Sequence, residues 1–468
     1  MQVAIRRHYL LNPKHHNNQS YMTLLIIGCG PGGYHTAEYA AKHGIEVTII
    51  EQAHAGGTCL NCGCIPTKSM CHDAEVADMV SAYTGERVTV NMEAVIQRKN
   101  NVISQLRSGM ETLMSAPGIT LVWGRAVLKD AHTVTVYAYT DDGKMQPEGT
   151  DYSADNIIIA TGSHPKMPPI AGIDTTGVIT STELLDINHI PARLCIVGAG
   201  VIGMEFASIF NSFGSEVTVV EYLKECLPVV DSDIAKRLRK LLEKRGINFV
   251  MQSAVKSIAK TGESLSLTYE RKGKEAVLEA DTILVATGRS ANVEGLGLET
   301  VGIDTSRSGI VVDDNMQTSV VGIYAIGDVN GLIMLAHAAS AQGVKCVNHI
   351  LGIKDSINLD IMPSAVFTTP EVASVGMSED TCRTKGIEYT VRKSFYRSNG
   401  KALTMDATEG MVKLMLDADN KIIGCHAYGA HAADLIQEVT AIMLFGGTYA
   451  DLHHIIHTHP TLSEVLLE

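Results

Sequence analysis

The chain of 468 residues lacks a long uninterrupted apolar run and lacks an excess of positive charge. Its most apolar segment, 194–220, contains Glu205 and several glycines, which excludes it as a membrane-spanning helix. The formal net charge of -13 and the isoelectric point near 5.8 disfavour nucleic acids and anionic membranes as partners, because both select for basic surfaces. We therefore expect neither a nucleic-acid partner nor a membrane.

A secretory signal is also absent. Residues 1–21 hold three basic and no acidic side chains but no apolar core, and we interpret them as a disordered or vector-derived leader before a natural start at Met22. The alternative is a transit peptide, which would place the protein in the mitochondrial matrix instead of the cytoplasm. The ten cysteines then indicate a reducing compartment, where a disulfide is usually catalytic and not structural.

The length suggests about three domains of ~150 residues. The first opens with a short apolar strand, 23–27, that leads into a Gly-x-Gly-x-x-Gly fingerprint, an alanine-rich helix and a second strand ending in Glu51. In this setting Gly28 makes the turn, Gly30 lets a pyrophosphate approach and Gly33 permits close helix packing. The pattern predicts a dinucleotide site in which Glu51 accepts hydrogen bonds from a ribose.

The same device recurs later in the chain. The strand 194–197 leads into a fingerprint from Gly198 to Gly203, and Glu221 closes the next strand at the same spacing of 23 residues. Each copy ends in an apolar strand followed by Ala-Thr-Gly, at 160–162 and at 286–288. Two copies with one spacing indicate two bound dinucleotides.

The first copy carries an insertion of 44 residues relative to the second. It contains the cysteine-rich stretch 56–68 and a long helical segment from about 72 to 114. Cys59 and Cys64 would be separated by about 7.5 Å of rise on an unbroken helix, beyond the ~4.4–6.8 Å Cα separation of a disulfide. Gly63 and Pro66 supply the break that pairing requires. One interpretation is a reversible disulfide lying against a flavin.

Two other interpretations of these cysteines are open. The stretch could be a metal cluster with Cys62, Cys71 and His72, or its thiols could be small buried apolar groups. A structural zinc module normally forms its own small unit and does not follow a dinucleotide fingerprint directly. We therefore predict no metal site.

The remaining segments complete the expected organisation. A proline-rich linker lies at 163–169, a strand ending in Asp328 lies at 324–328, and an alanine-rich helix follows from about Leu335. From about residue 358 the pattern is α+β, which we interpret as a domain for association. The predicted divisions are a leader, a first dinucleotide domain, a second dinucleotide domain, a return to the first domain, and an association domain, at 1–21, 22–165, 166–288, 289–355 and 356–468.

Four histidines lie within 453–459, and they could be a metal site or a polar helix face. His459 and Glu464 differ from the others, because Pro460 can open a short helix that places the carboxylate one turn beyond the imidazole. This spacing is typical of a general base with a group that orients it.

Together these motifs resemble the pyridine nucleotide–disulfide oxidoreductase family, and most closely its dihydrolipoyl dehydrogenases. The most specific parts of the resemblance are 56–68, 324–328, 363–376 and 457–464. The fold that it implies is α/β, with two Rossmann-like dinucleotide-binding domains and a C-terminal α+β dimerisation domain. Cys62 departs from the family pattern, which usually has valine there, and we expect it to be a bystander.

The resemblance implies two cofactors and their residues. FAD would be held by the first fingerprint and by residues that come after it in the chain, namely Gly28, Gly30, Gly33, Glu51, Thr58, Lys68, Ala126, Thr161, Gly162, Ser163, Asp328, Leu335, Ala336 and His337. NAD would be held by the second fingerprint and its surroundings, namely Gly198, Gly200, Val201, Ile202, Gly203, Glu205, Glu221, Val255 and Gly288.

The reaction implied is oxidation of protein-bound dihydrolipoamide with reduction of NAD. His459, oriented by Glu464, would take a thiol proton, the substrate would attack Cys59, and Cys64 would face the flavin. The partners implied are a lipoylated carrier domain and a second copy of the chain, in a homodimer whose active sites are shared. Rival functions are a glutathione or mercuric reductase, or a sensor that binds FAD and NAD without turnover.

Overall fold

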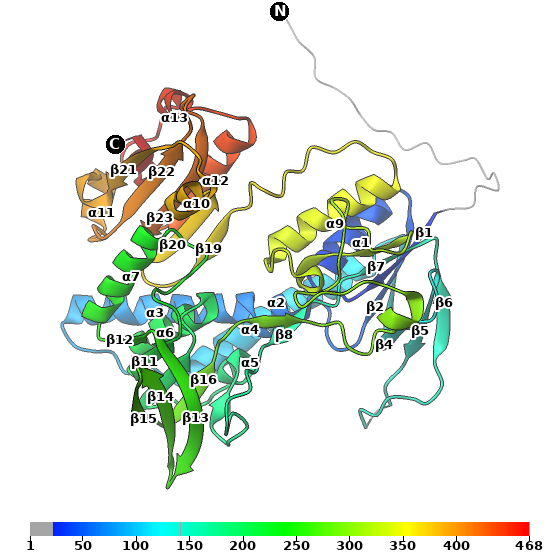
Figure 1. The fold of residues 1–468 in the computed structure, drawn as a ribbon, viewed down its shortest axis with the longest axis horizontal. Coiled ribbons are helices and arrows are strands. Elements are labelled where there is room, and N and C mark those ends of the chain that lie inside the picture. Colours follow the sequence, from blue (N-terminus) through cyan, green and yellow to red (C-terminus); the bar gives the residue numbers. More distant parts are fainter. Residues whose placement is uncertain (1–21, 141, 468) are drawn as a thin grey trace, which may run out of the picture.

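The computed structural model describes residues 22–140 and 142–467, so the expected leader lies outside the described residues. Figure 1 shows three units built around separate sheets, with the C-terminal sheet and the two dinucleotide-type sheets at different corners of the molecule. In the part of the chain that is described, no helix is long and apolar enough to cross a membrane.

The first unit contains a parallel sheet in the order β18-β7-β1-β2-β3. Its strands are short and almost wholly apolar because both faces are covered. Helices α1 (Pro31–Lys42) and α9 (Ala336–Ile350) pack together on one face, and an antiparallel sheet covers the other. The strands are β1 (Thr23–Ile27), β2 (Glu46–Glu51), β3 (Ile119–Trp123), β7 (Asn156–Ile159) and β18 (Ile323–Ala325), with β4 (Arg125–Leu128), β5 (Thr133–Tyr137) and β6 (Thr150–Ser153) in the antiparallel sheet.

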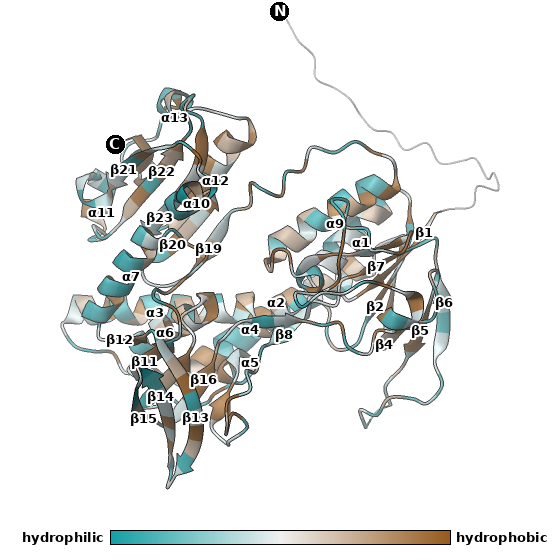
Figure 2. Cartoon of the chain, viewed as in Figure 1, coloured by the Kyte–Doolittle hydropathy of each residue, from teal (hydrophilic) through white to brown (hydrophobic). Residues whose placement is uncertain are grey.

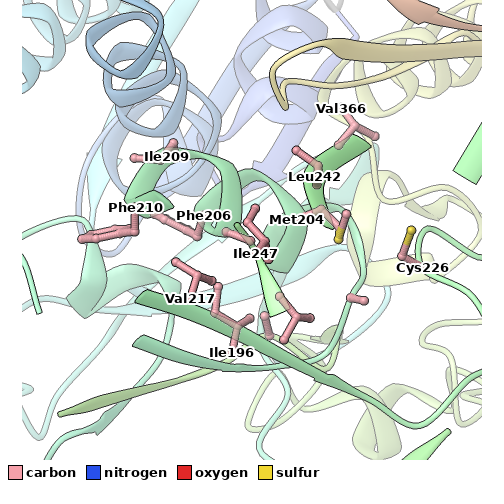
Figure 3. Close-up of a cluster of buried hydrophobic side chains, with 14 of the residues drawn as sticks. Ile196, Met204, Phe206, Ile209, Phe210, Val217, Cys226, Leu242, Ile247 and Val366 are labelled. Atoms are coloured by element: carbon pink, nitrogen blue, oxygen red, sulfur yellow. The ribbon is translucent and has the colours of Figure 1, made fainter. Parts of the chain in front are cut away.

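The second unit repeats this design, with a parallel sheet in the order β12-β11-β10-β16-β9 and an antiparallel sheet β13-β14-β15. Figure 3 shows the aromatic side chains of α6 (Val201–Phe213) packed near Ile196 and Val217 of the parallel sheet. The strands are β9 (Val178–Ile179), β10 (Arg193–Val197), β11 (Glu216–Glu221), β12 (Asn248–Met251), β13 (Ser253–Thr261), β14 (Ser264–Arg271), β15 (Lys274–Ala280) and β16 (Thr282–Val285). The α/β class and the internal repeat are confirmed.

The chain passes between these units at one place. Strand β8 (Ser163–Pro165) leaves the first unit and pairs antiparallel with β17 (Arg289–Ala291), where the chain returns. The predicted linker at 163–169 therefore begins as one strand of a two-stranded connection. Strand β18 then joins the first sheet beside β7, which explains why two distant segments build one unit.

The insertion in the first unit contains three helices, α2 (Gly57–Cys62), α3 (Cys64–Thr84) and α4 (Met92–Met114). The single helical segment expected from about 72 to 114 is wrong in this respect, because it is divided in two. Gly85, with a φ of +74°, ends α3, and the Asn91 side chain caps α4 by accepting from Ala94 N at 3.3 Å.

The C-terminal unit is an antiparallel sheet in the order β19-β20-β23-β22-β21 with helices around it. Figure 2 shows hydrophobic residues along the strands, whereas α7 (Ser232–Lys244), which lies against this unit, is mainly hydrophilic. The elements are β19 (Ser364–Val366), β20 (Glu371–Gly376), β21 (Thr390–Phe395), β22 (Met411–Leu416), β23 (Ile422–Gly429), α10 (Glu379–Lys385), α11 (Gly400–Thr404), α12 (Ala432–Leu444) and α13 (Tyr449–His454). Short elements elsewhere are α5 (Ser181–Leu184), α8 (Leu298–Val301), η1 (Gly327–Asn330), η2 (Tyr396–Ser398) and η3 (Leu462–Leu467).

The two fingerprints have the same backbone geometry. Gly28 and Gly198 each have a φ of +108°, which favours glycine at the turn. A Cβ added at Gly203 would lie 2.0 Å from Gly198 O, whereas one added at Gly200 would meet no atom within 4 Å. The third glycine of the fingerprint therefore serves packing, and the middle one leaves open space.

This geometry predicts a contrast between two substitutions. Gly203→Ala forces α6 away from the sheet, and overpacking of this kind costs about 1–3 kcal/mol of unfolding free energy. Gly200→Ala is the matched control and leaves the thermal unfolding midpoint unchanged, because its methyl group enters open space. Equal midpoints for the two variants, measured by calorimetry, would contradict the packing role of Gly203.

Candidate active site

One cavity of about 2020 Å³ joins all three units. Ordinary ligand pockets occupy about 300–1,000 Å³, so this cavity has room for two dinucleotides. It is lined by both fingerprints, by both Ala-Thr-Gly segments, by the cysteine stretch and by Phe367 of the C-terminal unit. Every residue predicted to bind FAD or NAD lines it, apart from Gly33 and Gly203.

Those two exceptions are explained by their packing role. A Cβ at Gly33 would lie 1.9 Å from Gly28 O, and the corresponding distance at Gly203 is 2.0 Å, so both glycines lie beneath the cavity floor. Gly30 is open to the cavity, with only Gly57 Cα at 3.8 Å from an added Cβ. The cradle therefore fits a pyrophosphate at each helix N-terminus.

The predicted break between Cys59 and Cys64 is confirmed. Helix α2 ends at Gly63, whose φ of -139° and ψ of -113° interrupt the helix before α3 begins at Cys64. The two thiols share a hydrogen bond, which together with burial raises the pKa of Cys59 well above its ordinary value. The same hydrogen bond, helped by Lys68 and opposed by burial, lowers the pKa of Cys64 to about 7. In the reduced pair, Cys64 is therefore the thiolate and Cys59 the thiol.

A partly buried ion pair lies next to these thiols. Lys68 Nζ lies 2.9 Å from both carboxylate oxygens of Glu205, which is 3% exposed, and Glu205 also accepts from Phe367 N at 2.9 Å. The ammonium lies 4.8 Å from the centre of the Phe367 ring. Although burial lowers the pKa of Lys68, Glu205 raises it overall, so the amine stays charged. The pair joins α3 of the first unit, α6 of the second and the start of the C-terminal sheet.

The acidic residues of the two fingerprints have equivalent partners. Glu51 accepts from Cys29 N and Ala53 N, both at 2.8 Å. Glu221 accepts from Ala199 N at 2.6 Å and from Leu223 N at 2.7 Å. Each carboxylate thus fixes the turn of its own fingerprint, and each oxygen retains acceptor capacity toward the cavity that it lines.

The second group of predicted flavin residues is connected across the domain junction. Asp328 accepts a hydrogen bond from the Ser163 hydroxyl, and Arg289 Nε donates to Ser163 Oγ at 2.7 Å. His337 Nε2 lies 2.7 Å from Pro363 O. Sequence reasoning missed Arg289, although its place directly after the second Ala-Thr-Gly was a signal, because a cation there lines the cavity. It also missed Phe367, which lies within the stretch 363–376 but was not assigned a role of its own.

His459 and Glu464 are brought together as predicted. His459 Nδ1 lies 2.9 Å from Glu464 Oε1, and Glu464 Oε2 accepts from Thr461 N at 2.8 Å. The hydrogen bond from Thr461 N, followed by that from His459, lowers the pKa of Glu464, which keeps it ionised. However, the His459 side chain is 79% exposed and does not line the cavity of its own chain. The chain therefore does not bring its own base to its own cysteines.

The other cysteines and histidines of these stretches each have a different partner and do not come together. Cys62 has a hydrogen bond with the Thr182 side chain, and burial raises its pKa. Cys71 Sγ donates to Phe367 O at 3.3 Å, and His457 Nε2 pairs with Glu438 Oε1 at 2.7 Å. Within the described residues, no group of three or more histidine, cysteine or acidic side chains could hold a metal ion.

Comparison with known proteins agrees with this geometry. The pattern of the pyridine nucleotide-disulphide oxidoreductase family matches residues 22–343, and that of its dimerisation domain matches residues 362–468. The mitochondrial dihydrolipoyl dehydrogenase of Pisum sativum is 37% identical over 456 residues, covering 95% of this chain and 90% of the pea protein. Leghemoglobin reductase of Glycine max is 37% identical over 456 residues, covering 95% and 86%.

A solved structure gives the same result. The HOCl-induced flavoprotein disulfide reductase RclA from Escherichia coli superposes with a TM-score of 0.84 at 32% identity, covering 96% of this chain and 98% of RclA. The match to a dimerisation domain indicates a homodimer. The chain therefore belongs to the pyridine nucleotide-disulphide oxidoreductase family, as a flavoprotein disulfide oxidoreductase whose cofactors are FAD and NAD.

Proposed function

We propose that the chain is an NAD-dependent dihydrolipoyl dehydrogenase, which oxidises protein-bound dihydrolipoamide and reduces NAD. The observation that carries this proposal is the Cys59–Cys64 pair, whose thiolate is stabilised beside the Lys68–Glu205 ion pair in a cavity that both fingerprints line. The pea relative at 37% identity bears the name of this activity.

The chemistry of the two thiols depends on the difference between their pKa values, since the pKa is raised for Cys59 and lowered for Cys64. His459 of one subunit removes a proton from the substrate dithiol, and because Nδ1 is held by Glu464, the atom that accepts this proton is Nε2. The substrate thiolate attacks Cys59 of the oxidised pair, which breaks the Cys59–Cys64 bond and releases Cys64 as a thiolate. The second substrate sulfur then attacks the first, which closes the lipoamide disulfide and releases Cys59.

The flavin and nucleotide sites correspond to the two fingerprints. FAD, when bound, supplies the two-electron transfer from the dithiol to NAD. We assign FAD to the first fingerprint with Glu51, Lys68 and Asp328, and NAD to the second with Glu205 and Glu221. The carboxylate of Glu221 repels the ribose phosphate of NADP, and Lys224 is the only cation among the residues that directly follow, Tyr222, Leu223 and Lys224.

The partners proposed are a lipoylated carrier domain, within a 2-oxo acid dehydrogenase or glycine cleavage complex, and a second copy of the chain. Each active site would be shared, because His459 is exposed and outside its own cavity. We also propose the cytoplasm as the location, because a disulfide with a catalytic and not a structural role is typical of a reducing compartment.

The rival functions are separable by chemistry. A mercuric reductase would use mercuric ion as its electron acceptor in place of a disulfide. A glutathione-type enzyme would be expected to have arginines for NADP after the second acidic strand, whereas here Glu221 is followed by Tyr-Leu-Lys at 222–224. A sensor without turnover would require neither Cys59 and Cys64 nor His459.

The decisive test is a comparison of electron acceptors. Purified protein is assayed with lipoamide, glutathione disulfide and mercuric ion, each with NADH and with NADPH. We expect lipoamide with NADH to give the highest kcat/KM, by about 10- to 100-fold over NADPH, since discrimination by the partly buried carboxylate of Glu221 amounts to roughly 1–3 kcal/mol. A preference for glutathione disulfide or for NADPH would refute the proposal.

The pH dependence of Cys64 gives a second prediction. Its pKa is lowered from 9.0 to about 7, so the thiolate persists above pH 7 and is lost as the pH falls below it. The long-wavelength charge-transfer band of the NADH-reduced protein should therefore rise with pH, with a midpoint near 7. Lys68→Met should move the midpoint upward because the ammonium is removed.

Two cysteine variants calibrate that measurement. Cys64→Ser should abolish the band and the lipoamide activity while FAD stays bound, whereas Cys62→Val should keep both, because Cys62 faces Thr182. A midpoint near pH 9, or loss of the band in Cys62→Val, would show that Cys64 is not the stabilised thiolate.

Subunit mixing tests the shared site. Cys59→Ser and His459→Ala chains are expected to be inactive as homodimers. After exchange under mild denaturant, each heterodimer pairs an intact Cys59 with an intact His459 in one of its two sites, so activity should return. A mixture that stays inactive, although mass spectrometry shows heterodimers, would place both residues in one chain's site.

A further inference from the structure

The loop at 222–230 forms one wall of the cavity next to the second fingerprint. It connects β11 to α7, and four of its residues line the cavity, namely Tyr222, Leu223, Pro228 and Val229. Tyr222 is 75% exposed and Val229 is 70% exposed, so these side chains are held in place by the backbone and not by packing of their own. The shape of this wall therefore depends on how the loop is attached.

The first attachments lie within the second unit. Glu221 accepts from Leu223 N, and Leu227 N donates to Ala199 O at 2.9 Å. Leu227 has a φ of +48°, a strained value for this residue type, so surrounding contacts must enforce it. Figure 3 shows Cys226 of this loop in the same buried cluster as Val366 of the C-terminal unit.

The other end of the loop is attached to a different unit. Asp231 comes directly after the loop and is fully buried, and its Oδ1 lies 2.7 Å from Lys413 Nζ on β22. Its Oδ2 accepts from Glu379 N at 3.0 Å, and Lys413 Nζ also lies 2.6 Å from Glu379 Oε2. Asp231 N donates to His426 Nδ1 at 3.2 Å. Both carboxylate oxygens and the main-chain N–H of Asp231 therefore have partners on the C-terminal unit, and Oδ1 also caps α7 by accepting from Asp233 N.

Such an attachment is more directional than apolar packing. Lys413 is 1% exposed and lies between two carboxylates, so removing the charge of Asp231 would leave this buried ammonium with only Glu379, the more exposed of its two partners. Arg383 pairs with Glu379 at the edge of the cluster, which balances the two acidic groups. The network thus permits one position of Asp231 relative to β22. Because Asp231 directly follows the loop, this also fixes where the loop ends.

We propose that Asp231 is a positioning residue for NAD: the C-terminal unit, through Lys413 and Glu379, holds the loop 222–230 in the shape that closes around the dinucleotide. The inference rests on the proposed assignment of NAD to the second fingerprint. It gives the dimerisation unit a second role, in binding of the nucleotide by the same chain.

The test uses the FAD-loaded dimer and Asp231→Asn, which keeps the shape of the side chain but loses the charge paired with Lys413 and one of the two oxygens that accept from Asp233 N and Glu379 N. If about a tenth of the molecules keep the competent loop, the Kd for NAD rises ~10-fold by calorimetry. KM for NAD rises similarly, with kcat and KM for dihydrolipoamide unchanged. Hydrogen exchange accelerates at 222–230 and not in β10 or β16.

Lys393→Met is the matched control, because it removes a 2.7 Å ion pair to Asp233 across the same two units but on α7 and at the surface. It should bind NAD as the native protein does. If Asp231→Asn does not fold, Glu379→Gln, which weakens the same network from a more exposed position, decides the question with the same readouts.

Three outcomes would overturn the inference. Native affinity for NAD in both network variants would show that the loop does not depend on the anchor. An equal loss in Lys393→Met would show a general weakening of the contact between units, as would a loss of bound FAD in parallel with NAD. Failure of the native protein to bind NAD would instead refute the proposed function itself.

Discussion

The ion pair between Lys68 and the buried carboxylate of Glu205 is the constraint on which the rest of the structure depends. A charge removed from water is tolerated only when it is paired and further hydrogen bonds satisfy it, and here Lys68 and Phe367 N together supply the partners of Glu205. Each of these three residues comes from a different unit. The three sheets must therefore be placed correctly before the charge beside Cys64 can be stable, so the redox centre is a property of the assembled chain.

The repeated fold shows how one scaffold takes two chemical roles. The fingerprints agree in glycine geometry and in the acidic residue that holds the turn. They differ in the segments that come next in the chain, since the first is succeeded by α2, α3 and α4 and the second by the loop at 222–230. Local backbone rules thus make the phosphate cradle, and the segment after it determines the chemistry.

Local features could be predicted from the sequence, and distant contacts could not. The fingerprints, the break at Gly63 and the pairing of His459 with Glu464 depend on residues close in the chain. Lys68 and Glu205 were each assigned to a cofactor, but their mutual contact spans 137 residues and leaves no periodic signal. The Lys413–Asp231 contact spans 182 residues and likewise leaves no pattern in the sequence. The division between α3 and α4 depends on two single residues, Gly85 and Asn91, which are a weak signal beside the helical pattern on either side of them.

Because the second unit is inserted between β8 and β17, the order of strands along the chain also sets the order in which the two parallel sheets can be completed. The second sheet is complete when the ribosome has passed Val285, whereas the first still lacks β18, which comes later in the chain. Until β18 arrives, β7 presents an open edge to any other strand nearby. The unit that begins the chain is thus the later of the two to close, and the nascent protein must protect that edge while its inserted neighbour is already finished.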